Sequence, residues 1–316
     1  MISSRVADRF SQVALLPLVR AAKRMYNAFA GKIVQSFTIC VGRESSEAMP
    51  MYPTYNPTPY YVRDRRWIMV QHWHDLLFAH WPVQPEALRP LVPSGLSIDT
   101  FDGPAWVGIV AFRLSGIRLR GLPPFPPVAA FNEINVRTYV TRGGRPGVYF
   151  LSMDADNPLA MAIARPWFRL PYTHARMEVR AGNGSVSFQE RRVQPDMPEA
   201  RFAATYGPCS APYEARPGSL DHWLTERYSY YTPGRAGRLY RCDIYHPRWA
   251  LQQAWARMGK NTLMESLGIE QPDSPALLHH AKYMRALIWP LCRHEQEAKR
   301  AVAAGTTRSR MIQSPL

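Results

Sequence analysis

The 316-residue chain is 46% hydrophobic and 12% aromatic, which is enough to build a folded core and excludes wholesale disorder. Its 39 basic and 24 acidic residues give a formal net charge of +15, a balance that permits anionic small molecules or nucleic acid as partners without requiring either. No run approaches the ~18 consecutive apolar residues of a membrane-spanning helix, so an integral membrane protein is not expected.

The 29 prolines favour short strands and ordered loops over long helices. None of the four cysteines stands in a CxxC spacing, so neither a disulfide framework nor a zinc ribbon is indicated. A reduced, cytoplasmic protein is therefore expected. Its oligomeric state stays open, a homo-oligomer included.

Residues 1–62 differ from the rest, because Asp8 is the only acidic residue before Glu44 and a proline-punctuated linker occupies 49–59. We interpret them as a poorly ordered extension. Two alternatives stay open: an amphipathic segment on an anionic membrane surface, and a cleaved transit-like peptide. The expected organisation is an extension over 1–62, one domain over 63–295 and a basic disordered tail over 296–316.

From residue 66 onward, alternation of apolar and polar residues predicts mostly strands. The first strand is expected at 75–83, followed by a short helix at 85–91. The dipeptide Asp102-Gly103 predicts a hairpin between strands at 98–101 and 105–112. The clearest strand pattern covers 131–141.

In the second half, Asn157 is a good N-cap for a helix that starts at Pro158 and ends near residue 168. The sequence Gly182-Asn183-Gly184 predicts a hairpin between 172–180 and 185–192. Further elements are expected as strands at 148–153, 228–231, 239–246 and 287–291 and a short helix at 261–267. Many antiparallel strands with few peripheral helices predict an α+β, mainly β fold, built as a barrel or curved sheet.

Several segments carry a family resemblance. The run WHDLLFAHWPVQPEALRPLVPSGLSIDTFDGPAWVGIVAF at 73–112 resembles the opening of the YqjF-like proteins, domain of unknown function 2071. The match continues in order with FNEINVRTYV at 131–140, PGVYFLSMDADNPLAMAIARPWFRLPYTHARM at 146–177, NTLMESLG at 261–268 and ALLHHAKYMRALIWPL at 276–291. That family has no established activity. Its fold is understood to resemble acetoacetate decarboxylase, so the resemblance implies a barrel-like sheet around a buried pocket.

Acetoacetate decarboxylases carry a motif similar to D-N-D-P-A-I-A-A-G-R-E-x-x-G-F-P-K-K, whose first lysine forms a Schiff base with the substrate. Here the similar passage at 154–173 ends in Pro171, Tyr172 and Thr173, so both lysines are absent. No lysine occurs between Lys32 and Lys260, and arginine stays protonated and non-nucleophilic. A Schiff-base decarboxylase is therefore not expected.

Alternation in 131–141 places Glu133, Asn135 and Arg137 on one face, with aliphatic residues on the other. This face is either an ordinary solvent-facing side or the lining of an internal pocket; the resemblance favours the pocket, because decarboxylases have a pocket glutamate in a similar strand. In 172–180 the same spacing groups Tyr172, His174 and Arg176. We expect Glu133, His174 and Tyr172 as candidate catalytic residues and Arg137, Arg176 and Asn135 as candidate ligand-binding residues. We also expect Glu133 to pair with an arginine or His174 across strands.

No metal site or cofactor is expected, since His80 is ~20 Å along an extended chain from His74 and cannot complete a site with it. The sequence contains no G-x-S-x-G motif and no Gly-rich phosphate loop after a strand. The expected partner is a small, carboxylate-bearing molecule in an internal pocket. Two alternatives remain: an enzyme of unknown, lyase- or hydratase-like reaction using Glu133 and His174, and a basic nucleic-acid-binding protein without sequence specificity.

Overall fold

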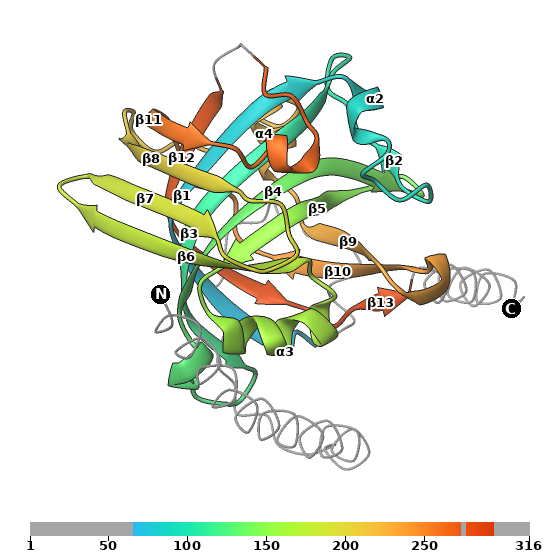
Figure 1. Ribbon diagram of the computed structural model, residues 1–316, viewed down its shortest axis with the longest axis horizontal. Coiled ribbons are helices and arrows are strands. Elements are labelled where there is room, and N and C mark those ends of the chain that lie inside the picture. The colour runs from blue at the N-terminus through green and yellow to red at the C-terminus, as the bar shows by residue number, and fades with distance from the viewer. Residues whose placement is uncertain (1–65, 273–275, 294–316) are drawn as a thin grey trace, which may run out of the picture. The chain divides into compact units, whose positions relative to one another are not determined.

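Runs of β-branched and aromatic residues, such as AWVGIVAF at 105–112, make strands the dominant element of this chain. The computed structural model describes residues 66–272 and 276–293; the extension expected over 1–62 and the tail expected over 296–316 lie outside them. The described residues form one 13-stranded sheet (Figure 1), whose strands are β1 (Met69–Val83), β2 (Ser97–Ile98), β3 (Ala105–Leu119), β4 (Phe131–Arg142), β5 (Arg145–Ala155), β6 (Tyr172–Gly182), β7 (Ser185–Arg192), β8 (Arg201–Pro208), β9 (Ser229–Pro233), β10 (Leu239–Tyr245), β11 (Leu251–Asn261), β12 (Leu277–Ile288) and β13 (Cys292–Arg293). The described helices are short: α2 (Pro85–Leu88), α3 (Pro158–Phe168), α4 (Leu220–Thr225) and the 3-10 turns η1 (Pro126–Val128), η2 (Arg235–Gly237) and η3 (Glu265–Leu267).

The strand order is β13-β10-β9-β5-β6-β7-β8-β11-β12-β1-β3-β4-β2, and two additional pairings join β4 to β5 and β10 to β12. Because these additional pairings connect strands far apart in the order, the sheet curves back on itself, as Figure 1 shows. The expected mainly β fold with a curved sheet and few helices is confirmed. None of the helices in the described part of the chain is both long and apolar enough to cross a membrane.

Strand β5 pairs with three strands, with β4 along one edge and with β9 and β6 along the other. One of its edges pairs with β4 along its whole length, from Arg145 opposite Arg142 to Ala155 opposite Glu133. Its other edge is divided, because Val148 and Tyr149 pair with β9 whereas 153–155 pair with β6. Both of these divided pairings are parallel, in a sheet that is otherwise antiparallel.

Strands β1, β3 and β4 are buried on both faces, which explains their long runs of apolar residues. On one face, Leu77 and Trp81 of β1 join Ile134 and Val136 of β4 in the largest hydrophobic cluster. On the other face, Phe78 of β1 belongs to a second cluster with residues of β3 and β12. Polar residues on that second face are therefore enclosed by the fold.

Three elements match their sequence predictions closely. Strand β4 covers the expected range, β6 and β7 form the expected hairpin, and α3 begins after Asn157, whose side chain accepts a hydrogen bond from the backbone N–H of Ala160 at 2.9 Å. The hairpin expected between 98–101 and 105–112 is wrong. The turn exists, with positive φ at Asp102 and Gly103, but β2 pairs with β4. Strand β3 pairs with β1 and β4 instead.

Candidate functional site

One row of residues runs across five neighbouring strands on the second face of the sheet. Pairwise register places Phe78 of β1 opposite Val110 of β3, and Val110 opposite Asn135 of β4. The row continues through Met153 of β5 to Tyr172 of β6. Residues that face each other in register lie on the same side of a sheet. Asn135 and Tyr172 therefore share one buried face, although 37 positions separate them in the sequence.

Glu133 is the most chemically distinctive residue of this face. It is only 3% exposed, and its Oε2 accepts a hydrogen bond from the Tyr172 hydroxyl at 2.8 Å. Its Oε1 accepts a second one from Asn135 Nδ2 at 3.1 Å. Burial raises the pKa of Glu133 to about 7, even though both hydrogen bonds and the charge of Arg137 act in the opposite direction. The carboxyl group is therefore ready both to give and to take a proton at neutral pH.

The expectation that Glu133 would pair directly with an arginine or with His174 is wrong. Its hydrogen-bond partners are the neutral Tyr172 and Asn135. Arg137 acts on it only through its charge, because four residues of extended strand separate the two Cα atoms by ~13 Å. The pairing was expected because an isolated buried charge is costly. In the structure, two neutral hydrogen-bond donors and the raised pKa of Glu133 reduce this cost instead.

Arg137 and Tyr139 extend the same face of β4. The Arg137 guanidinium carbon lies 5.5 Å from the centre of the Phe78 ring. The Tyr139 hydroxyl lies 2.7 Å from His80 Nε2. This arrangement depends on Gly108, since a Cβ atom there would lie 2.8 Å from His80 Cδ2. We call Glu133, Asn135, Arg137 and Tyr139 the β4 polar face.

Several buried polar atoms on or beside the β4 polar face have no hydrogen-bond partner among the described residues. They are Asn135 Oδ1, Arg137 Nε and His80 Nδ1. An unsatisfied buried donor or acceptor typically costs about 1–3 kcal/mol, so such atoms are concentrated where a protein receives water or a ligand. Their chemistry here, guanidinium, amide and imidazole, suits a small polar molecule.

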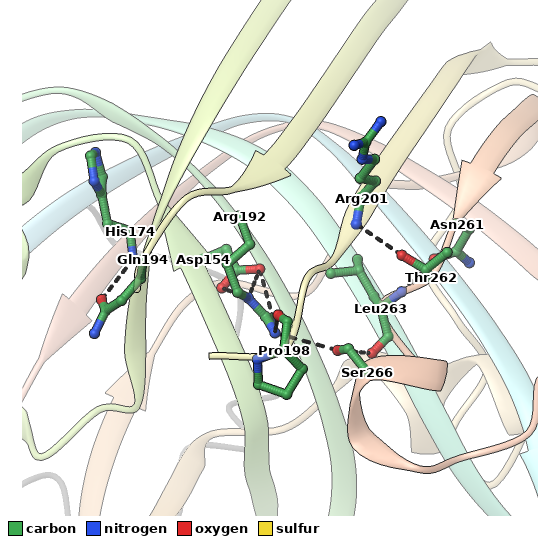
Figure 2. Close-up of polar contacts among 10 residues, drawn as sticks. All are labelled: Asp154, His174, Arg192, Gln194, Pro198, Arg201, Asn261, Thr262, Leu263 and Ser266. Carbon is green, nitrogen blue, oxygen red and sulfur yellow. Dashed lines mark hydrogen bonds and ion pairs between the residues drawn. The ribbon is translucent and has the colours of Figure 1, made fainter. Parts of the chain in front are cut away.

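His174 and Arg176 are placed differently from the expectation. His174 is half-buried and shares a register row with Glu133 through Ala155. Its backbone N–H donates to Gln194 Oε1 at 3.2 Å, and Figure 2 shows its imidazole pointing away from the neighbouring buried ion pair. Arg176 is exposed and does not join Glu133. The alternation was correct, but β6 pairs with β5 only over 172–174, so its later residues lie beyond the strands that enclose the face.

A second buried polar cluster is structural. Asp154 of β5 forms an ion pair with Arg192 of β7 at 3.0 Å, with side chains 1% and 2% exposed (Figure 2). Arg192 also donates to the Pro198 carbonyl and the Ser266 hydroxyl. Burial, followed by the charge of Asp154, raises the pKa of the neighbouring Glu190 to about 8. Arg192 thus donates hydrogen bonds to groups on three separate segments of the chain and links these segments to one another.

The histidines of β1 also have separate roles. His72 contacts the Tyr283 hydroxyl, His74 contacts Ser115 Oγ at 2.7 Å, and His80 contacts Tyr139. In the described ranges, no three histidine, cysteine, aspartate or glutamate side chains gather where they could hold a metal ion. Sequence reasoning considered His80 only as a metal ligand; the signal that it missed was Gly108, opposite His80 in the next strand.

A recess of about 620 Å³ opens beside the β4 polar face. Asn132 Nδ2 donates to Asp156 Oδ2 at 2.6 Å on its wall. Phe131 lines the recess and also packs against the clusters that contain Phe112 and Tyr172. Phe131 lines the recess and Glu133 does not, although the two residues lie two positions apart on the same side of β4. The recess is lined by His74, Arg113, Leu114, Ser115, Ala130, Phe131, Asn132, Asp156 and Asn157.

The chain is similar to proteins whose activity is not established. The family model DUF2071, described as an uncharacterized conserved protein, matches residues 70–285. The uncharacterized protein YqjF of Bacillus subtilis (strain 168) is 48% identical over 230 residues, which cover 73% of this chain and 94% of that protein. The YqjF-like resemblance seen in the sequence is confirmed.

A solved structure shares the fold at low sequence identity. The enduracididine biosynthesis enzyme MppR, solved with pyruvate, matches with a TM-score of 0.51 and 12% identity, covering 80% of this chain and 98% of that one. A structure of acetoacetate decarboxylase matches with a TM-score of 0.49 and 16% identity, covering 71% and 89%.

Proposed function

This chain belongs to the DUF2071 family of uncharacterized conserved proteins, and we propose that it binds a small carboxylate-bearing molecule on the β4 polar face. The observation that carries this proposal is Glu133. It is a fully enclosed carboxyl group with a pKa of about 7, held by Tyr172 and Asn135. Polar atoms of Asn135, Arg137 and His80 on or beside the same face have no hydrogen-bond partner among the described residues. Perturbed, buried acids of this kind are concentrated at binding and catalytic sites.

Each residue of the face has a distinct proposed role. Arg137 would hold the ligand carboxylate, because its Nε is buried and without a hydrogen-bond partner, and a guanidinium matches carboxylate geometry. Tyr172 would donate to a carbonyl or hydroxyl oxygen in place of Glu133. Pyruvate, which is bound in the MppR structure, is a molecule of the right size and charge to serve as a first probe.

Schiff-base chemistry forms no part of this proposal. Within the described residues, the only lysines are Lys260 and Lys282, and both are exposed. The buried position that resembles the decarboxylase lysine holds Tyr172, whose hydroxyl is not a nucleophilic amine. The ligand would therefore be bound through hydrogen bonds and charge alone.

An enzymatic role is a second candidate, favoured by the pKa of Glu133. A general acid–base works best when its pKa is near the operating pH, and about 7 meets that condition. Glu133 would transfer the proton and Tyr172 would stabilise a developing oxyanion. A lyase or hydratase reaction needs only such proton transfer, without a covalent intermediate.

Native mass spectrometry of the purified protein tests binding first, by searching for a small molecule that is carried over. Calorimetric titration with pyruvate and acetoacetate follows, on the wild type and on Arg137→Gln. We expect saturable binding that the Arg137→Gln variant loses by about tenfold or more, whereas the exposed control Arg176→Gln binds as the wild type does. Equal binding to both variants, or no binding of any carboxylate, would contradict the proposal.

A further inference from the structure

Two buried histidines, His80 of β1 and His279 of β12, lie next to each other beyond the β4 polar face. Both residues are 0% exposed, and their ring centres are 6.4 Å apart at an interplanar angle of 61°. His279 is paired in register with Phe78, so it lies on the same side of the sheet as Asn135 and Tyr172. In each ring, Nδ1 has no hydrogen-bond partner among the described residues.

The contacts of His80 determine which of its nitrogen atoms carries the proton. Burial, followed by the charges of Arg137 and His279, lowers its pKa well below 6.5, so the ring is neutral at physiological pH. Its Nε2 lies 2.7 Å from the Tyr139 hydroxyl, whose oxygen also interacts with the Arg137 guanidinium. A guanidinium can only donate, so the Tyr139 oxygen accepts from Arg137. Among the contacts of the described residues, the acceptor available to the Tyr139 proton is His80 Nε2, so the hydroxyl donates to it. The proton of His80 is then on Nδ1, which is a hydrogen-bond donor.

The contacts of His279 place its proton on the other ring nitrogen, Nε2, so that its Nδ1 is a hydrogen-bond acceptor. Its Nε2 lies 3.1 Å from Asp221 Oδ1, and Asp221 Oδ2 accepts a hydrogen bond from the Tyr213 hydroxyl at 2.9 Å. The His279 interaction is the main cause that lowers the pKa of Asp221, so this group is a carboxylate and can only accept. His279 Nε2 makes this contact without the geometry of a regular hydrogen bond, but two acceptors repel each other, so a nitrogen 3.1 Å from a carboxylate oxygen carries a proton. With one proton on the ring, at Nε2, Nδ1 is an acceptor.

The orientation of His80 aims its donor toward His279. The Cδ2 and Nε2 edge of the ring lies against Gly108 of β3, as the distances of 2.8 and 3.0 Å to a Cβ atom built there indicate. Nδ1 is on the opposite edge of the ring and faces the side of β1 on which β12 lies. A donor on His80 thus points toward the strand whose neighbouring ring offers an acceptor, with 6.4 Å between the two ring centres.

We propose that His80 and His279 form a hydroxyl-binding subsite, in which a ligand hydroxyl accepts from His80 Nδ1–H and donates to His279 Nδ1. The inference rests on the proposed function and narrows it, because the ligand becomes a small acid that carries both a carboxylate and a hydroxyl group. Arg137 holds the carboxylate end, and its register row contains Gly108 and His80, so both ends fall on one face, on the strands that flank β3.

Matched pairs of small acids test the subsite. Lactate and propionate differ by one hydroxyl, as do 3-hydroxybutyrate and butyrate. Calorimetric titration at pH 8 measures the affinities. The wild type should bind the hydroxylated member of at least one pair at least about tenfold more tightly than the other member. The reason is that an acid without the hydroxyl leaves a buried donor and a buried acceptor unpaired. His80→Phe and His279→Phe should lose this preference and keep the affinity for the member without the hydroxyl. The control is His280→Phe, because His280 lies on the opposite face against Tyr206 and should keep the preference.

The outcomes separate the two proposals. Equal binding of both members of every pair overturns the hydroxyl subsite and leaves carboxylate binding intact, whereas binding of neither member contradicts the proposed function and the subsite with it. A second measurement uses the wild-type protein alone, so it needs neither a ligand nor a folded variant. The ¹⁵N NMR spectrum of the histidine rings in the wild type should show the Nδ1–H tautomer for His80 and the Nε2–H tautomer for His279; the same tautomer in both rings overturns the inference.

Discussion

The Tyr172 hydroxyl donates to Glu133 Oε2 at 2.8 Å and so joins β6 to β4 across the intervening strand β5. Both residues are buried, so this hydrogen bond lies away from solvent. Burial, followed by the charge of Glu133, raises the pKa of Tyr172 well above 10, so the hydroxyl keeps its proton throughout the physiological range. The proton that changes with pH at this contact therefore belongs to Glu133.

The first prediction concerns the pH dependence of stability. The pKa of Glu133 rises from 4.5 to about 7 on folding, so its ionisation favours the unfolded chain. The quantity to measure is the difference in the free energy of unfolding, wild type minus Glu133→Gln. This difference should fall by about 3 kcal/mol as pH rises from 4.5 to 7 and stay level above that. Urea unfolding at each pH measures this difference, with the exposed Glu178→Gln as a control. A difference that is flat across this range would contradict the raised pKa.

The second prediction removes the Tyr172 hydroxyl. In Tyr172→Phe, Glu133 Oε2 loses the donor that lowers the pKa of Glu133, so this pKa should rise further. We expect a loss of about 1–3 kcal/mol of stability above pH 7, where the carboxylate is ionised. The matched control is Tyr149→Phe, a half-buried tyrosine in β5. If both variants lost the same stability at pH 8, the hydrogen bond to Glu133 would not be the cause.

The third prediction is chemical. Borohydride reduction in the presence of labelled acetoacetate should leave no covalent adduct on residues 63–295, because Tyr172 occupies the position similar to the Schiff-base lysine. Peptide mapping by mass spectrometry locates any label, and an enzyme with a known Schiff-base lysine serves as the positive control. An adduct at Lys260 or Lys282 would show that an exposed amine had been activated.

The fourth prediction concerns the buried ion pair in Figure 2. In Arg192→Met, Asp154 and Glu190 lose the guanidinium that lowers their pKa values, which should cost about 3–5 kcal/mol of stability. The double variant Asp154→Leu/Arg192→Met should recover part of this loss, since no lone charge then remains at that pair. Arg201→Met is the control, because its ion pair with Glu199 is exposed and should contribute less than about 1 kcal/mol. Denaturant unfolding compares the variants, and a single variant no less stable than the double variant would contradict the ion-pair argument.

The fifth prediction concerns the boundaries of the domain. A protein that begins at Met51 should keep the strand content and cooperative unfolding of the full chain, because the family match begins at residue 70. Circular dichroism and thermal unfolding measure both properties. Insoluble or non-cooperative protein would mean that the removed residues are part of the domain.

Local signals predicted those elements that local physics determines. The strict alternation of 131–141, the Asn157 cap and the Gly182-Asn183-Gly184 turn all lead to the observed β4, α3 and β6–β7 hairpin. Strands β8 and β11 were missed, and so was most of β12, of which only the last residues fall in the predicted 287–291. In β11, half-buried alanine and glutamine and an exposed arginine replace the β-branched residues that signal a strand, and pairing with β8 and β12 determines its conformation.

The candidate site could also be predicted only in part, where the pattern within a single strand determines it. Alternation correctly placed Glu133, Asn135 and Arg137 on one face, but a strand pattern does not say where a neighbouring strand ends. Arg176 was grouped with Tyr172 because they have the same spacing, and it is exposed because β6 leaves β5 after residue 174. The roles of His80 and His279 depend on β12 lying beside β1, a pairing of distant segments that no local pattern contains.

The divided edge of β5 has a consequence for the order in which this protein opens. Separating β6 from β5 still leaves β5 bonded to β4 and β9, and separating β9 still leaves it bonded to β4 and β6. Amide hydrogens of β5 that point toward β4 should therefore exchange with deuterated solvent only through global unfolding, whereas those at the far end of the β6–β7 hairpin should exchange through local fraying. The slowest-exchanging amides would then lie in the strand between Glu133 and Tyr172, which keeps the two residues at a fixed separation while the periphery moves.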